Sequence, residues 1–474
     1  MFKLIGVDDL EKLAQVVDGQ LMGENTNFGY LVVDSRVTKK NTVFIALHGE
    51  KFDGNIFCSE VLSKGCCAVI TDDPEIPGRI IVVNDTYLAL LKLAQYQLNK
   101  VKPRTLAITG SNGKTTVKEM IGSLLADQKT VVTKDNENNE FGIAYTVLKI
   151  DEDTENLIVE CGARKAGDFD LIVRYLWFDA LIITNLNNSH IGIFNSEENI
   201  LKTKLKLLEG LKTKGLLIEG AFNNLSKSYN KQDSDQNRIN IYHAKDEGEL
   251  SLKCSWIFNT EINESNLGSY NIGIVKKVTE SENERLNYSL KLGIRHNCSN
   301  AVISIALLKE WGNSEQVIQK IDGFVSPQKN RFYHSKLGDH ILINDTYNAN
   351  PTSMMSAITE LRTNANYPDS QIIVMGDMYE LGKSSVLEHT NILNELMALD
   401  KLKLLILVGD RFKISYQANT QAKESSFIYH LDRRTHLPKE SLKNTLKNNS
   451  VILVKGSRGM KMERYLELLR EIVL

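Results

Sequence analysis

The residues Thr109–Thr116 carry the clearest chemical signal in the sequence, since they combine two glycines, a lysine and several hydroxyls in one turn. Glycines at positions 110 and 113 let the backbone bend so that successive N–H groups point inward, where a helix dipole adds positive charge. Lys114 can reach the outer phosphates of a nucleotide, and the hydroxyl of Thr115 can ligate Mg²⁺. The expected ligand is a nucleoside triphosphate. The candidate residues for binding it are Gly110, Ser111, Asn112, Gly113, Lys114, Thr115 and Thr116.

A strand and a helix are expected on either side of this turn, as a phosphate site requires. Residues 105–108 form a short apolar run, and residues 117–125 place apolar side chains along one face of a helix. The strict phosphate-loop pattern has a glycine five positions before Gly113, where this sequence has Ile108. We interpret the turn as a shortened variant. The alternative is a glycine-rich turn that only closes a strand–helix unit.

Two further side chains follow apolar strands in the same part of the chain. Glu160 ends the run 157–160, and open α/β sheets gather their ligands at such strand ends, so this carboxylate can complete a Mg²⁺ shell. His190 lies just beyond the run 180–186. A lone histidine is often only a structural residue, so that alternative stays open for His190.

Lys204 is unusual because it lies in the apolar stripe of a helix expected at residues 197–209. It follows Ile200 by four residues and precedes Leu208 by four. A buried ammonium is costly unless it is paired or chemically altered. The alternative is that the aliphatic stem is buried while the ammonium reaches water.

The whole chain has the composition of an ordinary globular protein. It has 474 residues, 42% of them apolar and 24% charged, with a formal net charge of −2. No basic block stands out, so electrostatics gives no support for a role with nucleic acid or at a membrane surface. We expect a cytoplasmic protein without membrane insertion, because we find no signal-peptide core and no apolar run of about 20 residues.

The order of apolar runs predicts an α/β protein with three domains. Strands are expected at 30–34, 43–47, 68–71 and 80–83, and again at 341–344, 372–375, 404–408 and 452–454. We predict a small α/β domain at 1–84, a central domain with a mostly parallel sheet at 85–323, and a doubly wound Rossmann-like domain at 324–474. The stretch 225–292 is polar, with only a few alternating strands.

Several other polar turns could contribute to binding. Asp34–Arg36 and Gly49–Gly54 could hold a diphosphate and a sugar through charge-assisted hydrogen bonds, although such residues also make ordinary turns. Asn138–Gly142 is expected to be a loop. The amides of Asn297 and Asn300 could bond a base edge, or could simply cap the helix that follows.

Taken in order, these segments resemble the Mur ligase family of ATP-dependent amide-forming enzymes. Within the family, they match best the members that join D-alanyl-D-alanine to a UDP-N-acetylmuramoyl-tripeptide in peptidoglycan precursor synthesis. The matching segments are Asp34–Arg36, Gly49–Gly54, Thr109–Thr116, Asn138–Gly142, Glu160–Gly162, Ser189–His190, Lys204, His296, Asn297, Asn300, Asn344–Pro351, Val374–Met378, Glu380–Gly382 and Lys455–Met460.

The resemblance implies a fold, a mechanism and partners. The first domain would bind the UDP-sugar, the central P-loop domain would bind ATP, and the third would close over ATP and bind the incoming dipeptide. The γ-phosphate would pass to the tripeptide carboxylate, and the dipeptide amine would then displace phosphate from the acyl phosphate. We expect a monomer whose partners are its small-molecule substrates.

The resemblance also implies roles for the catalytic and metal-binding residues. Lys114 matches the family's phosphate lysine, and Thr115 with Glu160 matches its Mg²⁺ ligands. Glu160 and His190 match contacts to a second metal ion. Lys204 matches the lysine that becomes a carbamate, a change from cation to anion that would help to organise Mg²⁺.

Further matches concern ATP and the substrates. Asn297 matches the asparagine that contacts adenine, and Arg331 and Asp345 match the ATP contacts from the third domain. The residues that match the UDP-sugar side are Asp34, Ser35, Arg36, Gly49, Phe52, Asp53 and Gly54. The candidates around the peptide and the closure surface are Asn348, Asn350 and Arg458, and Asn138 and Asn139 are further candidates for binding substrate.

Two other functions remain open at this point. The chain could use a different acceptor, as another Mur ligase or a folylpolyglutamate synthase-like enzyme does. It could also be a nucleotide-binding scaffold without catalysis, because Lys206 stands where relatives usually carry glutamate and Asn330 where they carry glycine. Whether the third residue of the tripeptide is meso-diaminopimelate or lysine also stays open.

Overall fold

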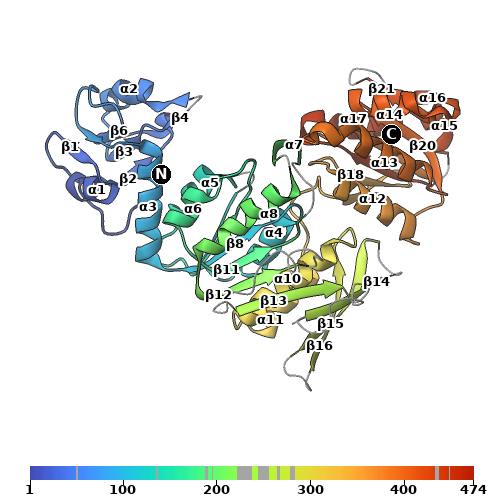
Figure 1. The fold of residues 1–474 in the computed structure, drawn as a ribbon, viewed down its shortest axis with the longest axis horizontal. Helices are drawn as coiled ribbons and strands as arrows, with labels where there is room; N and C mark the ends of the chain where they lie inside the picture. Colours follow the sequence, from blue (N-terminus) through green and yellow to red (C-terminus); the bar gives the residue numbers. More distant parts are fainter. Residues whose placement is uncertain are drawn as a thin grey trace.

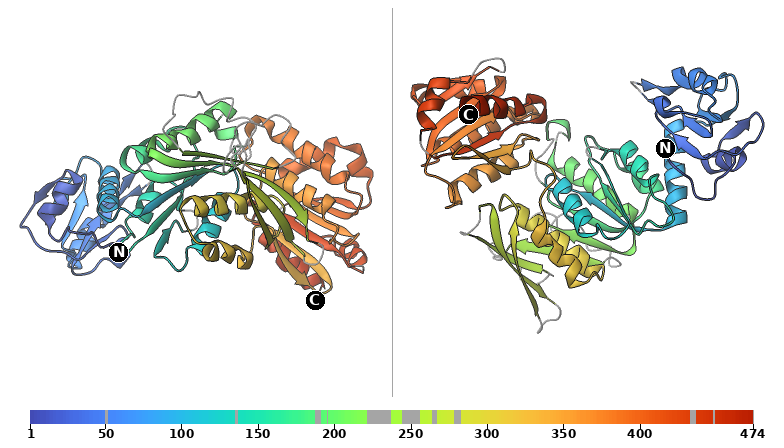
Figure 2. Two further views of the ribbon diagram at one scale, coloured as in Figure 1. Left: turned by 90° about the horizontal axis from the view of Figure 1, so that it is seen from below. Right: turned by 180° about the vertical axis from the view of Figure 1, so that it is seen from behind.

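The computed structural model describes residues 1–49, 52–134, 137–186, 191–194, 196–220, 237–243, 256–263, 267–277, 283–432, 437–447 and 449–473. They form three α/β units in chain order, each built around a sheet of its own. Figure 1 shows the first and third units at opposite ends of the molecule with the central unit between them, and both views of Figure 2 show the same order. No helix in the described ranges is long and apolar enough to cross a bilayer.

The first unit is a five-stranded sheet in the order β1-β7-β6-β3-β2. All neighbours are parallel except β1, which runs antiparallel to β7. The expected strands occur within two residues of their predicted ends. The elements are α1 (Leu10–Val17), β1 (Gln20–Met22), β2 (Tyr30–Val32), β3 (Thr42–Ile45), β4 (His48–Gly49), β5 (Phe52–Asp53), α2 (Cys58–Ser63), β6 (Ala68–Thr71) and β7 (Ile80–Val82). The helix α3 (Thr86–Val101) follows and leads into the central unit.

The central unit is a nine-stranded sheet in the order β16-β15-β14-β13-β12-β11-β8-β10-β9, parallel from β9 to β14 and antiparallel from β14 to β16. Its strands are β8 (Arg104–Thr109), β9 (Thr130–Val132), β10 (Asn156–Glu160), β11 (Phe178–Ile183), β12 (Leu211–Glu219), β13 (Asn237–His243), β14 (Trp256–Ile262), β15 (Ser269–Lys277) and β16 (Asn283–Lys291). Its helices are α4 (Lys114–Leu124), α5 (Glu140–Val147), α6 (Asp170–Tyr175), α7 (Ile191–Phe194), α8 (Glu197–Leu205), α10 (Asn297–Glu310) and α11 (Glu315–Gln319).

The register of three central strands determines where the polar turns meet. Ile108 on β8 pairs with Glu160 at the end of β10, and Thr109 pairs with Ile183 at the end of β11. Because the three strands are parallel, the segments that follow them leave the sheet at the same edge.

The third unit is a six-stranded sheet in the order β17-β18-β22-β19-β20-β21, parallel except for β17. The predicted strands of this unit are present. The elements are β17 (Tyr333–Leu337), β18 (His340–Asp345), α12 (Pro351–Thr363), β19 (Gln371–Gly376), α13 (Ser385–Met397), β20 (Leu402–Val408), α14 (Asp410–Ala418), α15 (Thr420–Glu424), β21 (Ile428–Leu431), α16 (Lys439–Thr445), β22 (Val451–Lys455) and α17 (Glu463–Val473).

The units pack against one another at two joints. At the first, α3 contacts both α1 and α5, and one continuous hydrophobic core extends from the first unit into the central one. At the second, the carboxylate of Glu360 on α12 accepts hydrogen bonds from the Tyr270 hydroxyl at 2.5 Å, the Asn364 amide at 2.7 Å and the Arg295 backbone N–H at 3.2 Å. Glu360 is 2% exposed and Tyr270 is fully buried.

Replacing Glu360 with alanine should destabilise this second joint, because three hydrogen-bond donors would lose their shared acceptor. A loss of about 3 kcal/mol is expected, which lowers the first thermal transition by roughly 5–10 °C in a unit of this size. Differential scanning calorimetry measures the transition, and Glu467→Ala on the exposed face of α17 is the matched control. Equal transitions for the two variants would show that the Glu360 network contributes no stability.

Candidate active site

The backbone of the turn between β8 and α4 requires glycine at two positions. Gly110 has φ +144° and Gly113 has φ +81°, in the region that side-chain-bearing residues avoid. A Cβ on Gly110 would lie 2.0 Å from the Thr184 hydroxyl, and one on Gly113 would lie 2.5 Å from Asn300 Oδ1. Since α4 begins at Lys114, the turn also presents the N-terminus of a helix.

Two residues that follow β11 hold this turn in place. The Asn185 carbonyl accepts from the Ser111 N–H at 2.8 Å, and its side-chain oxygen accepts from the Asn112 N–H at 2.7 Å. The Thr184 hydroxyl donates to the Asn112 carbonyl at 2.5 Å. Neither Thr184 nor Asn185 was predicted as a site residue, although a polar pair directly after an apolar strand is a signal for such a position.

Glu160 is the buried centre of the site, with 2% of its surface exposed. Its Oε1 accepts from the Thr115 hydroxyl at 3.2 Å and from the Asn138 amide at 3.1 Å, while Lys118 Nζ lies 3.3 Å from Oε2. Burial alone would raise the pKa of Glu160, but the charges of Lys118 and Lys114 hold it below its usual value. The carboxylate is therefore ionised, and the side chains of Thr115, Lys118 and Asn138 hold it at the end of β10.

Two lysines share one backbone carbonyl beside the turn. Lys114 Nζ donates to the Gly110 oxygen at 2.7 Å, and Lys204 Nζ donates to the same oxygen at 3.0 Å. Lys204 is only 3% exposed, so the alternative in which its ammonium reaches water is wrong. Burial, together with the charge of Lys114, lowers the pKa of Lys204 well below the usual value and favours the neutral amine. Burial also lowers the pKa of Lys114.

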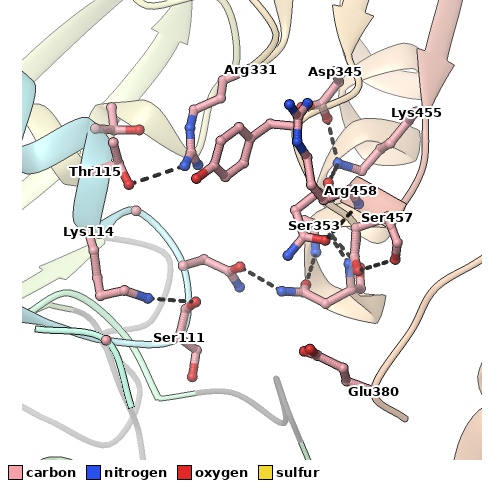
Figure 3. A pocket seen from close by; sticks show the side chains of 18 of the residues that line it. Ser111, Lys114, Thr115, Arg331, Asp345, Ser353, Glu380, Lys455, Ser457 and Arg458 are labelled. Carbon is pink, nitrogen blue, oxygen red and sulfur yellow. Dashed lines mark hydrogen bonds and ion pairs between the residues drawn. The ribbon is translucent and has the colours of Figure 1, made fainter. Parts of the chain in front are cut away.

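The third unit faces the turn with a second set of charged side chains (Figure 3). Arg331 donates to the Thr115 hydroxyl at 3.1 Å, and its guanidinium lies 3.8 Å from the centre of the Tyr347 ring. The Asp345 carboxylate accepts from Lys455 Nζ at 2.6 Å. Arg331 and Thr115 are 216 positions apart, so only the fold brings them together.

Three asparagine and arginine candidates of this unit lie near one another. Asn350 caps α12 and also donates to Asn112 Oδ1 across the gap between the units at 2.7 Å. Asn348 Oδ1 accepts from the Arg458 backbone N–H at 3.3 Å. The Arg458 side chain is exposed and pairs with Glu463.

A cavity of about 500 Å³ opens between the central and third units. Most of the residues predicted for catalysis and nucleotide binding line it. The predicted residues that line it are Ser111, Asn112, Gly113, Lys114, Thr115, Thr116, Asn138, Glu160, Lys204, Asn297, Arg331, Asp345, Asn348, Asn350 and Arg458. His190 lies outside the described residues.

The candidates of the first unit do not line this cavity. Arg36 donates to both carboxylate oxygens of Asp34, at 2.9 and 2.7 Å, and these bonds lower the pKa of Asp34 to about 2. Asp53 caps a short turn, and Phe52 is 57% exposed. The predicted residues that lie in this separate unit are Asp34, Ser35, Arg36, Gly49, Phe52, Asp53 and Gly54.

The expectation that Asn138–Gly142 is a loop was wrong. Helix α5 begins at Glu140, and Asn139 caps it by accepting from the Gly142 N–H at 2.9 Å.

Lys206 and Asn330, the two residues that differ from those usual in relatives, lie away from the cavity. Lys206 pairs with Glu209 in a 3-10 turn, and Asn330 accepts a backbone hydrogen bond from Tyr347. Neither residue lines the cavity.

Comparison with known proteins places this architecture in one family. The model of the Mur ligase middle domain matches residues 108–308, and that of the Mur ligase, glutamate ligase domain, matches residues 330–458. The UDP-N-acetylmuramoyl-tripeptide--D-alanyl-D-alanine ligase of Bacillus subtilis is 30% identical over 484 residues, covering 98% of each chain.

Two solved structures have the same fold as this chain over nearly its whole length. A crystal structure of MurF from Acinetobacter baumannii has a TM-score of 0.82 at 25% identity, covering 97% of this chain and 98% of that one. The MurF ligase of Thermotoga maritima, solved in complex with ADP, has the same fold, with a TM-score of 0.78 at 22% identity over 94% of this chain and 97% of that one. With both later units matched to family models and a relative matched from end to end, the chain belongs to the Mur ligase family.

Proposed function

We propose that this chain uses ATP to join D-alanyl-D-alanine to a UDP-N-acetylmuramoyl-tripeptide, in the synthesis of peptidoglycan precursors. The relative from Bacillus subtilis, which it matches along its full length, is named for this reaction. The observation that carries the proposal is the arrangement of Lys114, Thr115, Glu160 and Lys204 around one glycine turn, opposite Arg331 of the third unit.

The triphosphate of ATP lies against the backbone N–H groups at the start of α4. In the structure, Lys114 donates a hydrogen bond to the Gly110 carbonyl. A phosphate at the turn would give Lys114 a charged acceptor, which forms a stronger hydrogen bond. Arg331 and Asp345 contact the nucleotide from the third unit, and Asn297 lies near its base. Support comes from the cavity, because Lys114, Arg331, Asp345 and Asn297 all line it.

The side chains beside the turn suit Mg²⁺. The Thr115 hydroxyl and the Glu160 carboxylate are oxygen ligands of the kind this ion prefers, and both residues line the cavity. We propose His190 and a modified Lys204 as the remaining metal ligands. When bound, the ion offsets the negative charge that develops on the transferred phosphoryl group.

The reaction proceeds in two steps. A carboxylate oxygen of the tripeptide bonds to the γ-phosphorus while the bond to ADP breaks. The dipeptide amine then attacks the acyl carbon, phosphate leaves with that carboxylate oxygen, and the nitrogen loses a proton. The protein contributes by holding the reactants together and by placing cations where phosphate charge grows.

Lys204 enters this scheme as a carbamate. Its amine is buried and its pKa is depressed, so it is a nucleophile for CO₂. A C–N bond forms and the nitrogen loses a proton, which leaves an anion beside the charge of Lys114. This change removes the penalty of a buried lysine next to another cation.

The three units divide the substrates between them. We assign residues 1–84 to the UDP-sugar, with Asp34–Arg36 and Gly49–Gly54 as its contacts, and residues 85–323 to ATP. Residues 324–474 close over ATP and bind the dipeptide. Asn348, Asn350 and Arg458 are the proposed peptide contacts there, with Asn138 and Asn139 on the central side. We further propose that the enzyme is a cytoplasmic monomer.

An alternative keeps the fold and changes the acceptor, since a folylpolyglutamate synthase of Thermotoga maritima has the same general fold. The end-to-end match to dipeptide ligases favours the first proposal. A scaffold without catalysis is disfavoured because Lys114, Thr115 and Glu160 are all present and close together.

Phosphate release tests the proposal. The protein should release phosphate from ATP and Mg²⁺ only when both UDP-N-acetylmuramoyl-tripeptide and D-alanyl-D-alanine are present, because the acyl phosphate forms only on the tripeptide. A coupled phosphate assay measures the rate, with lysine and meso-diaminopimelate tripeptides tried in parallel.

Replacing the dipeptide with single amino acids is the control for the acceptor. Release that depends on an amino acid rather than on the dipeptide would support the alternative ligase. No turnover with any acceptor, together with normal ATP binding, would support the scaffold.

The carbamate proposal predicts the behaviour of Lys204→Ala. This variant should lose about 10²–10³-fold in kcat, the usual effect of removing a charge-stabilising group, and added acetate or bicarbonate should restore part of it by supplying an anion. Lys202→Ala, an exposed position on the same helix, is the control. Undiminished activity in Lys204→Ala would leave Lys204 with only a packing role.

A further inference from the structure

We propose that Lys118 is a positioning residue that cancels the charge of Glu160, so that the site accepts a divalent cation only together with nucleotide phosphate. This inference rests on the proposed function, because it concerns the same Mg²⁺·nucleotide site. Lys118 does not line the cavity. It acts through the carboxylate that does.

The placement of Lys118 follows from helix geometry. Thr115 and Lys118 are three positions apart on α4, so their side chains lie on the same face, one above the other. That face lies against the end of β10, where Glu160 is found. The helix therefore engages the carboxylate twice, through the Thr115 hydroxyl at Oε1 and through the Lys118 ammonium at Oε2.

Burial makes this pairing obligatory. The Lys118 side chain is 3% exposed and that of Glu160 is 2% exposed, and their charged atoms lie 3.3 Å apart. An ammonium withdrawn from water is tolerated only beside a compensating charge. Glu160 Oε2 has no hydrogen-bond donor, so the Lys118 charge is what compensates it on that side.

The two carboxylate oxygens consequently have different surroundings. Oε2 faces Lys118 in the interior, whereas Oε1 faces the Thr115 hydroxyl and the Asn138 amide, both of which line the cavity. Lys118 thus holds the carboxylate by its inner oxygen and leaves the outer one toward the cavity.

The charge balance around Glu160 then decides what can bind. Three cations, Lys118, Lys114 and Arg331, act on this single carboxylate. Two further carboxylates line the cavity, Glu380 and Asp345, and Asp345 is paired with Lys455 at 2.6 Å. Arg164 and Arg458 line it as well, so the positive charges outnumber the negative ones. A free divalent cation would enter a region of net positive charge, which disfavours it. The phosphates of a nucleotide bring the missing negative charge.

Manganese binding tests the inference without any measurement of activity. Mn²⁺, a paramagnetic substitute for Mg²⁺, is titrated into the protein and followed by electron paramagnetic resonance, with and without ADP. The wild type should bind Mn²⁺ with ADP and show no binding below millimolar Mn²⁺ without it. Lys118→Met should bind Mn²⁺ without nucleotide at least about tenfold more tightly than the wild type, because a nearby positive charge is gone.

Three further variants make the result specific. Lys118→Gln retains a hydrogen-bond donor toward Glu160, so it serves if the methionine variant does not fold, and it should show the same gain. Lys118→Arg retains the charge and should show none. Lys129→Met, at a half-exposed surface ion pair, controls for loss of a lysine elsewhere.

Each outcome bears on one claim. A gain of nucleotide-free binding in Lys118→Met or Lys118→Gln supports the inference, since a merely destabilised protein does not gain affinity. Tight Mn²⁺ binding by the nucleotide-free wild type, or unchanged affinity in both neutral variants, would overturn it. Failure of the wild type to bind Mn²⁺ even with ADP would instead contradict the proposed function.

Discussion

The register of three parallel strands is the constraint on which the rest of the structure depends. Because β8, β10 and β11 end at the same edge of the sheet, Asn185 can hydrogen-bond to the glycine turn, and Glu160 can accept from Thr115 directly after that turn. A shift of one residue in β10 would turn the Glu160 side chain to the opposite face of the sheet. The apolar strands thus determine the position of the charged groups, although they carry no chemistry themselves.

Buried charge is the cost of this arrangement. Glu160, Lys118 and Lys204 are each no more than 3% exposed, and Lys114 shares the Gly110 carbonyl with Lys204. The interior tolerates them because each has a partner or, for Lys204, a depressed pKa that favours the neutral form. Such a cluster is held in place before any ligand arrives, which spares the reaction the cost of assembling it.

The sequence predicted well those features that depend on short spacing. The turn at Thr109–Thr116 and the carboxylate at the end of β10 follow from local patterns. The apolar stripe around Lys204 gave burial of its ammonium only as one of two alternatives. Lys118 was missed although it lies three residues beyond Thr115, because a lysine on an amphipathic helix is usually exposed. The strands in the described parts of 237–291 were hard to predict because their residues are largely polar. Contacts such as that of Arg331 with Thr115 depend on how two units pack, which local spacing does not encode.

The central claim is that the protein transfers the γ-phosphoryl group of ATP to the tripeptide carboxylate. Labelling that carboxylate with oxygen-18 tests it most directly, because the acyl phosphate mechanism leaves one carboxylate oxygen on the released phosphate. Mass spectrometry of the phosphate formed in the presence of D-alanyl-D-alanine should find one labelled oxygen per molecule. Product formation with unlabelled phosphate would contradict the account.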